Sequence, residues 1–78
     1  MNKSYALLYL CEQLKEGKAI DMQTCMLVYD ISVPTFRRYM ADLRAFFTEK
    51  YGLEIKYISA KKGYFLTPNP FIENIENQ

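Results

Sequence analysis

The chain has 78 residues, half of them hydrophobic, and a formal net charge of +1. This length holds one small domain with a modest core, and three glycines and three prolines are too few for a disordered or low-complexity chain. Histidine is absent and the two cysteines do not form a CxxC pair, which argues against a zinc site. We expect no metal and no other cofactor.

The first segment has apolar residues at the three- and four-residue spacing of a helix, namely Leu7, Leu10, Cys11 and Leu14. We expect this helix to span about residues 5–16, with Ser4 as its N-cap and Gly17 at its C-terminal end. Its apolar run is too short for a signal peptide, and large residues precede Cys11 where cleavage requires small ones. No segment approaches the length of a membrane span. We therefore expect a cytoplasmic protein without a membrane partner.

A second helix is predicted over residues 22–29, after a short extended link at residues 19–20 and with Asp21 as N-cap. Its inward face comprises Met22, Cys25, Met26 and Tyr29. Cys11 and Cys25 thus fall on the inward faces of two different helices, where a free thiol behaves as a small hydrophobe. A disulfide between them stays open as an alternative, because sequence alone constrains bridges poorly.

A tight turn at Asp30 and Ile31 precedes a third helix. Ser32 is a suitable N-cap, Pro34 suits the first helical turn, and the helix ends near Tyr51. Its apolar stripe comprises Phe36, Met40, Leu43 and Phe47. A helix, a short turn and a longer helix form the helix-turn-helix arrangement.

The hydrophobic spacing changes to strict alternation after the third helix. Leu53, Ile55 and Tyr57 alternate with other residues, as the inward positions of a half-buried strand do. A turn at residues 59–63 and a second strand at residues 64–66 complete a hairpin with a lysine-rich tip, which prolines terminate. The predicted fold class is α+β, with three helices followed by a two-stranded hairpin in residues 1–68. Residues 69–78 form a polar C-terminal tail.

Charge is distributed unevenly along the chain. Residues 32–67 contain seven basic and three acidic residues, a net charge of +4, while the remainder has a net charge of −3. On the third helix, the face opposite Phe36 carries Pro34, Arg38, Ala41 and Ala45, with Arg37 and Arg44 on one flank and Asp42 on the other. A solvated face could carry the same arginines, but the preceding helix, the tight turn and the basic hairpin favour a nucleic-acid interface.

Two segments together resemble a known family. Residues 32–40, SVPTFRRYM, resemble the S-x-x-T-[IV]-x-R-x-[LIM] recognition helix of bacterial winged helix-turn-helix regulators. Residues 62–66, KGYFL, are similar to the G-x-G-Y-x-L wing of the same group, which includes the DNA-binding domains of biotin-operon repressors, DeoR-type regulators and WYL-domain regulators. The resemblance covers about residues 5–68. The sequence departs from the pattern at Asp30, where glycine is usual, at the first wing glycine, which is a lysine, and at Tyr39, where an acid is usual.

The resemblance implies a sequence-specific double-stranded DNA-binding protein, a bacterial or phage transcriptional regulator. Helix 32–50 would enter the major groove, and the 59–63 wing would lie on the adjacent backbone or minor groove. The hydroxyls of Ser32 and Thr35, with the amides of the first turn, are suited to a phosphate. The resemblance and the helix face together predict these DNA-contacting residues: Ser32, Pro34, Thr35, Arg37, Arg38, Arg44, Lys61 and Lys62.

Four apolar residues occupy positions that are usually polar: Tyr5, Tyr9, Leu27 and Val28. They suggest a homodimer interface or a contact with another protein. The alternative function is therefore a winged-helix protein–protein interaction module, such as a phage-encoded inhibitor or an assembly adaptor. Enzyme activity is not expected, because histidine and a glycine-rich phosphate loop are both lacking and Asp42 is explained as an i, i+4 ion pair with Arg38.

Overall fold

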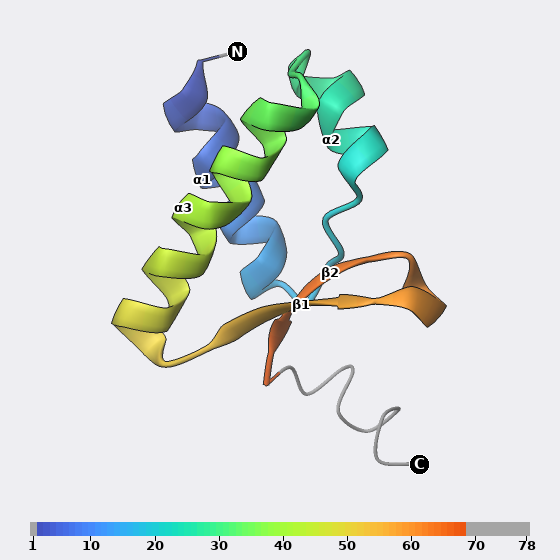
Figure 1. The fold of residues 1–78 in the computed structure, drawn as a ribbon. Helices are drawn as coiled ribbons and strands as arrows, with labels where there is room; N and C mark the ends of the chain where they lie inside the picture. Colours follow the sequence, from blue (N-terminus) through green and yellow to red (C-terminus); the bar gives the residue numbers. More distant parts are fainter. Residues whose placement is uncertain (1, 69–78) are drawn as a thin grey trace.

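The computed structural model describes residues 2–68 and contains three helices followed by a two-stranded antiparallel hairpin (Figure 1). The elements are α1 (Lys3–Lys15), α2 (Met22–Tyr29), α3 (Val33–Tyr51), β1 (Glu54–Ile58), a 3-10 turn (Ser59–Lys61) and β2 (Gly63–Thr67). This is an α+β chain with a winged-helix layout, as the sequence predicts. The predicted polar tail at residues 69–78 lies outside the described residues.

The N-cap of α1 differs from the prediction. Asn2 caps the helix instead of Ser4, because its Oδ1 atom accepts a hydrogen bond from the backbone N–H of Tyr5 at 3.0 Å. The helix therefore begins at Lys3. At its other end Gly17 adopts the left-handed conformation with φ of 79°, which agrees with the expected C-terminal glycine.

The second helix and the turn after it follow the sequence prediction. The Asp21 carboxylate accepts hydrogen bonds from the backbone N–H and the hydroxyl of Thr24, at 2.9 and 2.7 Å, and these bonds hold the pKa of Asp21 below its usual value. Asp30 takes the left-handed conformation, with φ of 52° and ψ of 56°. Asp30 thus adopts the backbone conformation that a glycine would usually adopt in such a turn. The turn forms although Asp30 departs from the pattern of the winged-helix regulators that the sequence resembles. Ser32 then caps α3, accepting from the Thr35 N–H at 3.4 Å.

The core lies between α1, α3 and the hairpin, and α2 closes one side. Its buried residues are Ala6, Leu10, Leu14, Ile20, Cys25, Phe36, Tyr39, Met40, Leu43, Phe47, Ile55 and Leu66. The predicted stripe of α3 is confirmed. On α1, Leu7 and Cys11 belong to the predicted apolar stripe but are only partly buried. Ala6, which the prediction did not include, is buried. Tyr39 also joins the core, at 6% exposure, which is a packing reason for an aromatic residue at this position.

The hairpin is joined to the link between α1 and α2. Ile55 pairs with Leu66 and Tyr57 pairs with Tyr64 across the two strands. Ile20 exchanges two backbone hydrogen bonds with Tyr64, both at 2.9 Å, so the link forms a bridge to β2. The alternation predicts Tyr57 on the inward face, but its side chain is 53% exposed.

The bridge requires close backbone approach at Gly63, which gives a stability prediction. A Cβ at this position would lie 2.7 Å from the Ala19 Cβ and 3.3 Å from the Ile20 carbonyl oxygen. We expect Gly63→Ala to lower the free energy of unfolding by about 1–3 kcal/mol, the usual cost of overpacking, measured by urea denaturation. Adding Ala19→Gly removes the nearest atom, so a double-mutant cycle should show a coupling of at least about 0.5 kcal/mol. An unchanged urea midpoint in Gly63→Ala would contradict the close approach.

Candidate nucleic-acid interface

The exposed face of α3 carries the predicted arginines. Burial of Phe36 and Met40 turns the opposite face to solvent, where Arg38, Ala41 and Ala45 are exposed. Pro34 and Arg37 are also exposed in the first half of the helix, as predicted. This face combines small side chains with cations, so another surface can approach the helix backbone closely.

Three predicted side chains meet at the N-terminus of α3. The Ser32 hydroxyl donates to the Thr35 Oγ1 atom at 3.1 Å, and the Arg38 guanidinium donates to the same oxygen at 3.3 Å. The Ser32 side chain also occupies the Thr35 N–H, and Pro34 has no N–H to offer. The first turn therefore has fewer backbone donors for an anion than the sequence suggested. Anion binding here would depend on the hydroxyls and on Arg38.

The expected ion pair between Arg38 and Asp42 is wrong. Asp42 lies with its Oδ2 atom 3.4 Å from the Nζ atom of Lys3 and so joins α3 to α1 instead. Arg38 contacts Thr35. Among residues 2–68, the three ion pairs involve none of the predicted DNA-contacting cations, which leaves those charges available to a ligand.

Arg44 lies apart from the other arginines of α3. Its Cζ atom is 5.7 Å from the centroid of the Tyr64 ring, a cation–π contact that joins the helix to the hairpin. Lys61 and Lys62 are exposed at the hairpin tip, where Lys62 has a left-handed backbone with φ of 54°. The structure thus divides the predicted site into the N-terminal half of α3, the hairpin tip, and Arg44 between them.

The predicted partner residues are all exposed. Tyr5 and Tyr9 lie one turn apart on α1, and Leu27 is 84% exposed on α2 beside a shallow hollow lined also by Met26. Val28 borders a different hollow between α1 and α2. A further apolar groove, which the sequence did not indicate, lies between α1 and α3 and is lined by Leu7, Leu8, Cys11, Asp42, Leu43 and Phe46.

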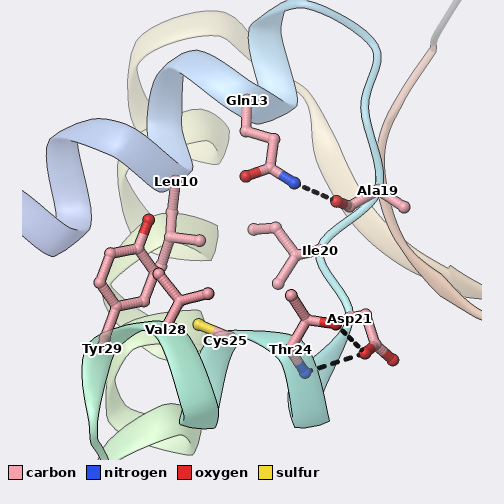
Figure 2. Close-up of a pocket in the computed structure, with 9 residues that line it drawn as sticks. All are labelled: Leu10, Gln13, Ala19, Ile20, Asp21, Thr24, Cys25, Val28 and Tyr29. Atoms are coloured by element: carbon pink, nitrogen blue, oxygen red, sulfur yellow. Dashed lines mark hydrogen bonds between the residues drawn. The ribbon is translucent and has the colours of Figure 1, made fainter.

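The hollow beside Val28 has a volume of about 270 Å³ and is drawn in Figure 2. Gln13 of α1 donates a hydrogen bond to the Ala19 carbonyl at its rim, and Cys25 of α2 points toward it. Burial, with a smaller effect from the Asp21 charge, raises the pKa of Cys25 to about 11. A thiol with this pKa is a poor nucleophile at neutral pH. Both cysteines are free.

The cysteines should differ in reactivity. Cys11 is partly exposed and Cys25 is buried, so we expect one thiol per chain to react quickly with a disulfide reagent at pH 8 and the second to react only after unfolding in urea. Cys11→Ser should abolish the fast phase. Two thiols reacting at equal rates in the native protein would contradict the burial of Cys25.

Within residues 2–68, none of the helices has the length and hydrophobicity that crossing a bilayer requires, and no group of three or more acidic or cysteine side chains could hold a metal ion. In comparisons with known proteins, no protein-family model, no curated protein and no solved structure matches the chain. What the site does must therefore be inferred from its residues and their arrangement.

Proposed function

We propose that the protein binds double-stranded DNA sequence-specifically and acts as a transcriptional regulator in the cytoplasm. One observation carries the proposal: the exposed, arginine-bearing face of α3 stands in the same winged-helix layout as an exposed Lys61-Lys62 hairpin tip. The segment that contains both, residues 32–67, has a net charge of +4. The resemblance of residues 32–40 and 62–66 to bacterial winged-helix regulators supports the same function.

In this proposal α3 enters the major groove with its N-terminal half foremost. Ala41 and Ala45 allow the helix backbone to approach the groove floor, and Arg37 and Arg38 reach base edges or the groove wall. The hydroxyls of Ser32 and Thr35 contact a phosphate at the groove edge. Lys61 and Lys62 lie on the adjacent backbone or minor groove.

Fluorescence anisotropy with mixed-sequence duplex DNA, at two salt concentrations, tests the proposal. Binding should weaken steeply with salt, because each phosphate contact contributes about −0.9 to the slope of log K against log salt. Arg38→Ala should weaken binding to a selected site by about 5- to 150-fold, the usual range for a base contact, and Lys62→Ala should reduce the salt slope by about 1.

Lys18→Ala is the matched control, since Lys18 is exposed, lies outside residues 32–67 and is paired with Glu16 at 3.7 Å. It should bind as the wild type does. No binding of wild type to any duplex at low salt would refute DNA binding. Unchanged affinity in both Arg38→Ala and Lys62→Ala would refute the proposed docking.

A second candidate is a protein–protein interaction module, including a homodimer. The exposure of Tyr5, Tyr9, Leu27 and Val28 favours it, since large apolar side chains at adjacent surface positions lose water contact on association. A dimer would also strengthen DNA binding, because few phosphate contacts give weak affinity at physiological salt.

Sedimentation velocity distinguishes these states. If α1 forms a dimer interface, wild type should sediment as a dimer at micromolar concentration and Tyr9→Glu as a monomer, because a buried, unpaired carboxylate is costly. Lys18→Glu, a charge change elsewhere on the surface, should leave the dimer intact. A monomer mass for both wild type and Tyr9→Glu would remove this interface.

A further inference from the structure

One cation of α3 and two aromatic rings of the hairpin form a row of side chains that runs from the helix to the hairpin. The Tyr64 ring lies 6.1 Å from Phe36 of α3, centroid to centroid, which fixes it on the core-facing side of the hairpin. Arg44 lies over Tyr64, and Tyr57 meets the same ring edge-on at 5.0 Å as its cross-strand partner. We refer to these three side chains, Arg44, Tyr64 and Tyr57, as the Arg44–Tyr57 row. It extends from the middle of α3 toward the lysines of the hairpin tip.

The outer members of the row are exposed and keep free polar groups. Arg44 is exposed and Tyr57 is 53% exposed, whereas Tyr64 is partly buried between them. Within the described part of the chain, neither the Tyr57 hydroxyl nor the Arg44 guanidinium has a hydrogen-bond or ion-pair partner. A guanidinium that stacks on a ring still presents its N–H edges outward, and those edges match an anionic oxygen pair.

We propose that the Arg44–Tyr57 row binds the phosphate backbone of duplex DNA beside the groove that α3 enters. The inference rests on the proposed function and adds which side of the hairpin meets DNA. Arg44 is held toward the hairpin, away from the exposed centre of α3 at Ala41 and Ala45, so it is positioned for a backbone strand and not for base edges. Hydroxyl and guanidinium donors to phosphate carry no sequence information, so the row supplies affinity and orientation.

Charge complementarity selects a phosphate backbone as the occupant. Arg37 lies on the same flank of α3 as Arg44, and Lys61 and Lys62 follow Tyr57 at the hairpin tip, so cations stand at both ends of the row. Glu54 lines a hollow with Arg44, and its carboxylate is paired with Lys56, 3.7 Å from the Nζ atom. Positively charged side chains therefore flank the row, and the negative charge of a polyanion would complement them.

Lys18 offers a matched control, because it is exposed, is paired with Glu16 and belongs to neither α3 nor the hairpin. Lys18→Gln removes the same charge as Arg44→Gln from a surface that the proposal leaves free. Tyr57→Phe removes one hydroxyl and retains the ring and its packing. All three positions are exposed, and thermal unfolding followed by circular dichroism checks that each variant is folded.

The test measures anisotropy with two probes: a duplex selected by wild type from a random-sequence pool, and a scrambled duplex of the same composition. Arg44→Gln should weaken binding to both duplexes by the same factor and reduce the salt slope by about 0.9. Tyr57→Phe should weaken both by about 2- to 10-fold, as loss of one hydrogen bond does, without changing the slope. Lys18→Gln should match wild type.

The other outcomes separate two failures. Loss of affinity for the selected duplex alone in Arg44→Gln would make Arg44 a base reader and overturn the inference, while leaving DNA binding intact. Equal losses in Lys18→Gln and Arg44→Gln, or no loss in Arg44→Gln and Tyr57→Phe, would also overturn it. If wild type binds neither duplex at low salt, or binds only single-stranded DNA or protein, the proposed function fails and the row's assignment fails with it.

Discussion

Burial of one stripe of α3 fixes the rotation of that helix, and the positions of its surface side chains follow from it. Phe36 and Phe47 are almost fully buried and lie three turns apart on the same side, so the helix cannot turn about its axis without exposing both rings. That constraint directs Arg38, Ala41 and Ala45 outward. The Ser32 cap and the left-handed Asp30 then set where the helix begins relative to α2.

The hairpin depends on a second constraint, the bridge between Ile20 and Tyr64. Two backbone hydrogen bonds hold the link after α1 against β2, and Gly63 allows the approach because it has no side chain. The bridge and the Phe36 ring together fix Tyr64, and Tyr64 in turn positions Arg44 and Tyr57. The geometry of the wing relative to α3 is therefore set by packing at its base, while the Lys61-Lys62 tip is exposed.

The sequence predicted the features that local chemistry decides. The limits of α2 follow from the Asp21 cap, and the stripe of α3 follows from its spacing, because both depend on residues within a few positions of each other. It did not predict the Lys3–Asp42 ion pair, the Arg44–Tyr64 contact or the exposure of Tyr57, since each depends on how separate elements pack. Alternation in β1 indicated that Tyr57 faces the core side, but it carries no information on where the core ends.

The two flanks of α3 differ in a way that affects both proposed functions. Arg44 lies on the hairpin side, whereas Asp42 and Phe46 lie on the α1 side, in the apolar groove that Leu8 also lines. The α1 side presents an apolar groove and an aspartate that is already paired with Lys3, whereas the unpaired cations lie on the hairpin side and the exposed face, so a DNA duplex on α3 would lie there. The α1 side stays free for a protein. DNA binding and protein binding are thus compatible on one domain, because the proposed partner residues belong to α1 and α2, whereas the proposed DNA contacts belong to α3 and the hairpin.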